Sequence, residues 1–134
     1  MKKITVTKTD YQHLKKLTGN PVKGNTPEHL IRLYEELERA KKVESIKVEP
    51  DVVTMNTEIE FTDLDTNTTR RLKLVYPQFA DIKKGHVSIL APIGTALLGY
   101  RKGDVVEWEV PGGKKKFLIK DIIYQPEANG DLLA

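Results

Sequence analysis

The sequence has no cysteine among its 134 residues, and this absence excludes two classes of site. Disulfide bonds and thiolate metal centres both require cysteine sulfur. Serine is scarce as well, because only Ser45 and Ser88 occur, and neither lies in the Gly-x-Ser-x-Gly turn that presents a hydrolase nucleophile. The sequence therefore offers no anchor for a nucleophilic triad.

Long apolar segments are also missing. No run approaches the roughly 20 residues that a membrane-spanning helix needs, and the lysines after Met1 lead into polar residues rather than the apolar region of a signal peptide. Hydrophobic residues make up 39% of the chain and charged residues 31%, a balance that suits a modest core with a charged exterior. We therefore expect a cytoplasmic protein that makes no contact with a membrane.

Positive charge is present but dispersed. The net charge is +3, and 22 basic residues are interleaved with 19 acidic ones. A nucleic-acid-binding domain usually gathers its basic side chains on one face. Separate solvated patches are thus the favoured interpretation, with a weak nucleic-acid contact as the alternative. The short basic clusters are Lys15-Lys16, Lys41-Lys42, Arg70-Arg71, Lys83-Lys84 and Lys114-Lys115-Lys116.

Residues that could hold a metal or a cofactor do not recur at the required spacing. His13, His29 and His86 fall on different expected elements, so they form no ligand set. The carboxylate pairs at positions 58/60 and 63/65 each lack a third ligand. The glycine-containing segments match neither a phosphate loop nor a dinucleotide fingerprint. We expect no catalytic residue, no metal, no cofactor and no small-molecule substrate, and hence a protein that is not an enzyme.

The first third of the chain predicts two amphipathic helices. Thr7 is expected as the N-cap of the first helix, with Asp10 in its first turn, where an acid interacts favourably with the helix dipole, and with Gly19 at its end. Thr26 is expected as the N-cap of the second helix, with Pro27 in its first position. The second helix should span about 17 residues, or about 25 Å. A tight turn between two such helices favours an antiparallel helical hairpin. The expected apolar faces consist of Tyr11, Leu14 and Leu17, and of Leu30, Leu33, Tyr34, Leu37 and Ala40.

After Pro50 the hydrophobic period changes from 3.6 to about 2, which is typical of strands. Five strands and one short helix are expected, and this order predicts an α+β fold with an antiparallel sheet. We predict two units, a helical hairpin over residues 1–48 and a sheet domain over residues 49–134. The strands are expected near 58–62, 71–76, 87–90, 104–110 and 115–124, and the helix over 92–99.

Several separated segments resemble the carboxyl-terminal domain of the bacterial GreA/GreB (Gre) transcription factors. Ala91 to Gly99, Gly103-Asp104, Pro111 to Gly113 and the strand ending at Tyr124 are spaced as in that domain. The short hairpin and the segments 52–56, 74–77 and 124–131 are similar to the Rnk branch of the family. The resemblance implies an FKBP-like fold for residues 49–134 and RNA polymerase as the partner, bound near its secondary channel.

The resemblance also implies where polymerase would bind. In the Gre family the corner between a strand and the short helix docks on the enzyme, and here that corner consists of Leu90, Ala91, Pro92 and Ile93. For Ile93, docking and packing against the sheet both stay open. Leu97 and Leu98 on the same helix are expected to be buried.

The tip of the helical hairpin departs from the Gre pattern. Gre factors place acidic residues at the tip of a long coiled coil, where they help hold a metal during cleavage of backtracked RNA. Here the tip, Asn20, Pro21, Val22 and Lys23, carries no carboxylate. We therefore expect a polymerase-binding regulator that acts by occupancy and does not stimulate cleavage. The alternatives are a peptidyl-prolyl isomerase, suggested by the fold, and a small nucleic-acid-binding module.

Overall fold

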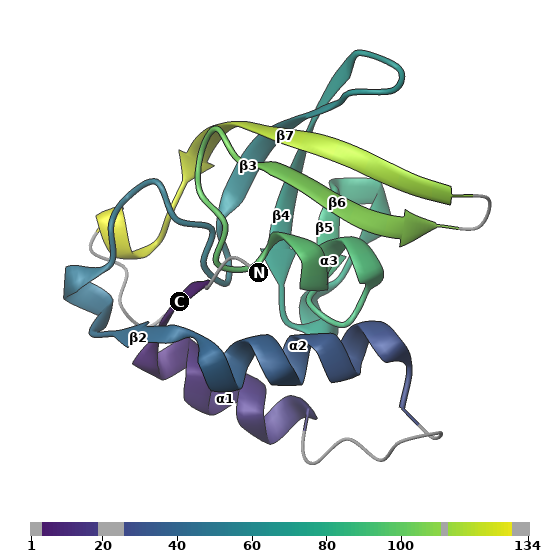
Figure 1. Cartoon of the computed structure of the whole chain (residues 1–134). Coiled ribbons are helices and arrows are strands. Elements are labelled where there is room, and N and C mark those ends of the chain that lie inside the picture. Colours follow the sequence, from purple (N-terminus) through teal and green to yellow (C-terminus); the bar gives the residue numbers. More distant parts are fainter. Residues whose placement is uncertain (1–3, 19–25, 111–112, 130–134) are drawn as a thin grey trace.

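The largest element of the fold is a five-stranded sheet, and the α-helices lie on one side of it, with α3 next to the sheet and α2 beyond α3 (Figure 1). The computed structural model describes residues 4–18, 26–110 and 113–129. The strands lie in the order β5-β4-β3-β7-β6, and the mixture of helices and sheet confirms the predicted α+β class. Their bounds are β3 (Glu58–Asp63), β4 (Thr68–Val75), β5 (His86–Ser88), β6 (Val105–Val110) and β7 (Gly113–Tyr124).

Strand β5 corrects the prediction of a wholly antiparallel sheet. The β3–β4, β3–β7 and β6–β7 pairs are antiparallel, but β5 runs parallel to β4, with Lys73 beside His86 and Val75 beside Ser88. The cause is the connection over residues 76–85. It folds back on itself through two 3₁₀ turns, η2 (Pro77–Phe79) and η3 (Ile82–Lys84), and returns the chain to the level of Lys73 before β5 begins.

The two amino-terminal helices are α1 (Lys8–Thr18) and α2 (Glu28–Arg39). Lys15 Nζ lies 4.0 Å from the centre of the Tyr34 ring, and Lys42 Nζ lies 4.6 Å from the centre of the Tyr11 ring. Tyr11, near the start of α1, thus contacts Lys42, just after the end of α2, whereas Lys15, further along α1, contacts Tyr34 in the middle of α2. The two helices therefore run in opposite directions. The segment that joins them, 19–25, lies outside the described residues.

Helix α2 is shorter than predicted, with 12 residues in place of about 17. It begins one residue later than expected, with Pro27 at the N-cap, and ends where Ala40 adopts an extended conformation, with φ −61° and ψ 149°. The next residues form β2 (Lys41–Val43), which pairs in parallel with β1 (Thr5–Thr7). Hydrogen bonding to β1 thus replaces the last helical turns that the sequence indicated.

One core is shared by the helices and the sheet. Ile4, Leu14 and Leu37 from the amino-terminal segment belong to the same buried cluster as Ile59 and Leu74 from the sheet. The division into units at residues 48 and 49 stays a prediction. Helix α3 (Pro92–Leu97) contributes Leu97, and Leu98 follows it; both are buried as expected, whereas Leu17 is 39% exposed.

Two further 3₁₀ turns are η1 (Ser45–Lys47) and η4 (Glu127–Asn129). No helix in the described ranges is long and apolar enough to span a membrane.

Candidate functional site

The predicted docking corner lies between β5 and α3 and is fixed by local hydrogen bonds. The amide of Ala91 donates to the carbonyl oxygen of Ser88 at 3.0 Å, and the amide of Thr95 donates to that of Ala91 at 3.0 Å. Pro92 occupies the first turn of α3, where its fixed φ suits a helix start. Gly94 then packs so closely that a Cβ atom would lie 2.2 Å from the Ser88 carbonyl oxygen. The corner is therefore a rigid feature.

The four corner residues differ in exposure. Pro92 is exposed, whereas Leu90, Ala91 and Ile93 are half-buried. Leu90 and Ile93 pack against the edge of the core, so each presents only part of its side chain to solvent. The burial of Ile93 gives it a share in packing and leaves a part of its surface for contact with another molecule. The corner thus presents a small apolar surface centred on Pro92.

Helix α2 contacts the same corner through His29. His29 Nε2 donates a hydrogen bond to the carbonyl oxygen of Leu90 at 2.9 Å, and α2 packs beside α3. These two residues are 61 positions apart, and the sequence analysis, which only placed His29 on a different element from the other histidines, did not predict this contact. Helix α2 and the corner are therefore in direct contact.

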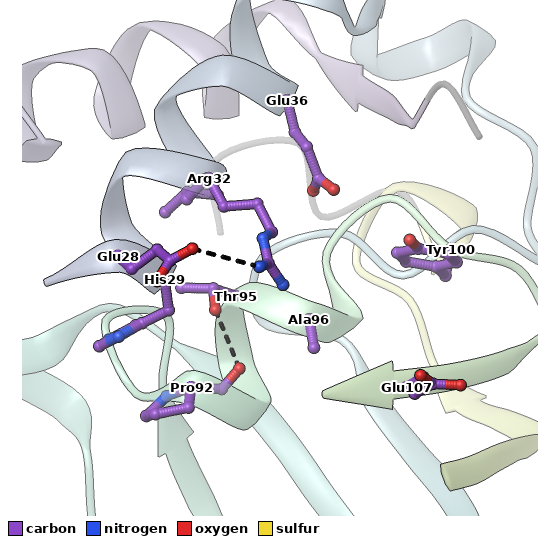
Figure 2. Close-up of a pocket in the computed structure, with 10 residues that line it drawn as sticks. Glu28, His29, Arg32, Glu36, Pro92, Thr95, Ala96, Tyr100 and Glu107 are labelled. Atoms are coloured by element: carbon purple, nitrogen blue, oxygen red, sulfur yellow. Dashed lines mark hydrogen bonds and ion pairs between the residues drawn. The ribbon is translucent and has the colours of Figure 1, made fainter. Parts of the chain in front are cut away.

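A cleft of about 540 Å³ separates α2 from α3 and β6. Figure 2 shows Arg32 and Glu36 reaching from α2 toward α3, with Tyr100 and Glu107 at the far side. Partial burial raises the pKa of the Glu36 carboxyl, and the nearby arginines oppose that rise. Arg32 itself lies 3.9 Å from Glu28. The cleft also includes His29, Leu33, Pro92, Thr95 and Ala96 among its lining residues.

A buried carboxylate, that of Asp10, joins α1 to the segments that precede β3 and follow β4. Asp10 was expected only as a first-turn acid, yet it is 3% exposed and accepts hydrogen bonds from the Met55 amide at 3.2 Å and the Tyr76 hydroxyl at 3.3 Å. Burial, reinforced by the negative charge of Glu127, raises its pKa to about 6, and the hydrogen bonds oppose that rise. The predicted N-cap is confirmed, because the Thr7 hydroxyl accepts from the Asp10 amide at 3.0 Å.

The carboxylate pairs weighed as metal ligands have other partners. Asp63 bonds Lys115 at 3.2 Å and accepts from the Asp65 amide in the β3–β4 turn. Glu60 lies within 3.7 Å of both Arg71 and Lys120. Within residues 4–18, 26–110 and 113–129, no three His, Asp or Glu side chains gather closely enough to hold a metal ion. The hairpin tip, Asn20, Pro21, Val22 and Lys23, lies outside the described residues.

Family models cover both parts of the chain. Residues 47–124 match the C-terminal model of the transcription elongation factors GreA/GreB, and residues 2–43 match the model of the Rnk N-terminus. The chain is 42% identical over 102 residues to the regulator of nucleoside diphosphate kinase of Escherichia coli (strain K12), and the match covers 75% of each chain. It is 30% identical over 99 residues to the elongation factor GreA of Desulfotalea psychrophila, covering 74% of this chain and 62% of the relative.

A solved structure shows the same architecture. The prokaryotic transcription elongation factor GreA/GreB from Nitrosomonas europaea superposes with a TM-score of 0.77 and 35% sequence identity. The superposition covers 92% of this chain and 100% of the other chain. The likeness therefore extends across the helices as well as the sheet.

Proposed function

This chain belongs to the GreA/GreB family of transcription elongation factors and carries an Rnk N-terminus, and from that premise we propose that it regulates transcription by binding RNA polymerase near the secondary channel. The observation that carries the proposal is the corner, where Pro92 is exposed on a rigid turn. Binding through a preordered apolar surface loses little conformational entropy, which favours docking. Leu90, Ala91, Pro92 and Ile93 form the proposed contact.

The proposed mechanism is occupancy rather than catalysis. The sheet domain, which we propose to be FKBP-like and to span residues 49–134, docks through the corner. The helical hairpin of residues 1–48 then lies at the channel entrance and competes with longer factors. The protein acts in the cytoplasm without an enzymatic activity or a cofactor. Any effect on nucleoside diphosphate kinase, the subject of the relative's name, is indirect.

Ion pairs argue against nucleic-acid binding, and the packing of the aromatic rings argues against a prolyl isomerase. A nucleic-acid-binding module would depend on the basic clusters Arg70-Arg71 and Lys114-Lys115-Lys116. These clusters are partly neutralised, because Lys114 lies 3.3 Å from Glu107, and Lys115 and Arg71 also pair with acids. A prolyl isomerase needs aromatic rings around its substrate proline. Phe61 and Phe117 instead pack together in the core, with 8% and 7% exposure.

A pull-down against purified core RNA polymerase tests the proposal. We expect retention at near-physiological salt, and displacement by an added Gre factor, because both would occupy the same surface. Binding to nucleic acid alone would instead weaken steeply with salt and need no polymerase. A proline-isomerisation assay on a model peptide checks the other rival. Failure of polymerase to retain the protein would remove the proposed function.

A further inference from the structure

A second cavity, distinct from the cleft beside α2, lies where the connection 76–85 covers the end of β4. Its volume is about 850 Å³, within the range of sites for small molecules. The side chains come from β4, β5, η2, η3 and the segments around Asn56 and Tyr124. None of these residues belongs to the docking corner. The chemistry of the lining is cationic and aromatic.

Three nitrogen-bearing side chains converge on this cavity. Lys73 on β4 and His86 on β5 are register partners in a parallel pair, so their side chains lie side by side on one face of the sheet. Lys84 approaches from η3. Lysine ammonium groups and histidine are common partners of phosphate oxygens. The lining of the cavity therefore includes three nitrogen-bearing groups of the kind that bind phosphate.

The charges of Lys73 and Lys84 differ from those of several other basic residues on the sheet, which form ion pairs. Arg71, two residues before Lys73 on the same strand, pairs with Glu60 at 3.7 Å. Across the described part of the chain no carboxylate lies within ion-pair distance of Lys73 or Lys84. Lys73 is also half-buried, which makes an unpaired ammonium costlier and an anionic ligand more favourable.

Two acids near the cavity have to be weighed against these cations. Asp81 lines the cavity, but its carboxylate accepts a hydrogen bond from the Lys83 amide at 3.1 Å as the N-cap of η3. Glu58 is the register neighbour of Lys73 on β3, and it does not line the cavity. The lining therefore keeps a positive balance of two lysines against one aspartate, before His86 is counted.

An aromatic ring and two amides complete the site. Phe79 borders the cavity with 60% of its surface exposed, which leaves its ring open to stacking with a planar base. Asn56 and Gln78 offer amide donors and acceptors that suit ribose hydroxyls or base edges. We propose that this cavity binds a nucleoside phosphate, with its base on Phe79 and its phosphates on Lys73, Lys84 and His86.

The site is preformed, because the connection that builds it is held by the backbone. The Asp81 and His86 backbones exchange two hydrogen bonds of 2.9 Å, and the Lys73 amide donates to the Gly85 carbonyl oxygen at 2.9 Å. Gly85 has a φ of 74°, in the left-handed region that favours glycine. A ligand would therefore not have to order the loop as it binds.

The test is calorimetric titration of the full chain with ATP, ADP, AMP, adenosine and tripolyphosphate. We expect dissociation constants of about 0.1–1 mM for the nucleoside polyphosphates, weaker binding of AMP and none of adenosine. The double variant Lys73→Gln/Lys84→Gln should weaken ATP binding about tenfold or more. Phe79→Ala should weaken ATP and ADP but leave tripolyphosphate unchanged, since only the base would use the ring.

Lys16→Gln/Lys41→Gln is the matched control, because it removes two exposed lysines that lie outside the lining of the cavity. Equal loss of ATP binding in both double variants would overturn the proposal, as would absence of binding at millimolar ATP. A short oligoribonucleotide distinguishes a free nucleotide from the end of an RNA strand, since both carry a base and a phosphate. If it binds more tightly than ATP and with the same sensitivity to Phe79→Ala, the ligand is the end of an RNA strand. These results do not depend on polymerase, so they leave the proposed function untouched.

Discussion

At the residue scale, Asp10 shows how one carboxylate can join two parts of a fold. Its backbone amide is held by the Thr7 N-cap, while its carboxylate turns inward to Met55 and Tyr76. The Tyr76 oxygen also lies 3.4 Å from His13 Nδ1, so the cluster links α1 to the sheet domain. Sequence analysis placed an acid at this helix start correctly but assigned it only to the helix dipole. The inward bonds need partners 45 and 66 residues away.

Asp10 predicts a specific dependence of stability on pH. Its pKa is raised from 3.8 to about 6, so at intermediate pH the folded protein keeps a proton that the unfolded chain has released. The contribution to the free energy of unfolding is therefore complete below about pH 4 and is lost as pH rises through 6. Asp10→Asn cannot titrate and keeps an acceptor for the Met55 amide. Relative to wild type, it should gain up to about 3 kcal/mol between pH 4 and 7.

Urea denaturation of both proteins across that range measures the effect. Asp65→Asn serves as control, because Asp65 is an exposed carboxylate in the β3–β4 turn. Parallel pH curves for wild type and Asp10→Asn would show that the buried carboxylate does not carry this dependence.

Pro92 supports a second residue-scale prediction, on docking. Pro92→Asp should remain folded, because the residue is exposed and an acid is favourable at a helix start. The new charge would enter a contact that loses water on binding, so affinity for core polymerase should fall about tenfold or more. Ile46→Asp is the matched control, since Ile46 is apolar, 76% exposed and outside the corner. Fluorescence anisotropy with labelled protein gives the affinities, and equal binding of both variants would place the contact elsewhere.

At the scale of elements, sequence signals within a short segment predicted the helices and strands that such segments form by themselves. The two amphipathic helices, the Pro-initiated α3 and the β6–β7 pair were recognisable from capping residues, periodicity and turn residues. The errors concern pairing between distant segments. The β1–β2 ladder joins residues 36 apart, and its residues 41–43 had been interpreted as a continuation of the helix. Parallel pairing of β5 likewise depends on the path of a connection, which periodicity does not encode.

In the candidate site, too, the local features could be predicted from the sequence and the contacts between distant segments could not. The corner at residues 90–93 could be located from its strand, proline and helix order, and from its likeness to the Gre pattern. Its surroundings could not, because the His29 contact and the cleft arise from the placement of α2 against α3. The sequence also gave no sign that Lys73 and His86 would be neighbours, since the parallel register that joins them was not foreseen.

Strand β1 gives a prediction at the element scale. No strand was expected before the first helix, and Leu17 was expected on the apolar face of that helix, but Val6 is 1% exposed and Leu17 is 39% exposed. Val6→Ala should therefore lower the free energy of unfolding by about 2 kcal/mol. Leu17→Ala should change it by less than about 1 kcal/mol, although it removes more atoms. Thermal and urea denaturation decide between these values, and a larger loss for Leu17→Ala would contradict the packing described here.

At the scale of the whole molecule, the shared core ties the helices to the sheet. Ile4 lies so close to Gly99 that a Cβ atom there would be 2.5 Å from the Ile4 Cβ, and His29 contacts the corner from α2. The helices are thus part of the same packed body as the proposed docking surface. With 12 residues, α2 extends about 18 Å, which is shorter than the sequence alone suggested. Both features limit how far α1 and α2 would extend into the proposed polymerase channel.

This limited reach gives the last prediction, which concerns RNA cleavage. The unmodified protein should not stimulate cleavage in a backtracked polymerase complex, because its helices are short and residues 18–27 contain no carboxylate to hold a metal. Asn20→Asp with Lys23→Glu should not restore activity, since the new ligands would still lie too far from the catalytic centre. Longer helices without these acids should fail because they bring no ligand. Only the combination should produce cleavage, a non-additive result expected when two requirements meet in one site. Shortening of labelled RNA in a stalled complex, with the metal supplied, is the measurement; cleavage stimulated by the unmodified protein would refute the occupancy mechanism.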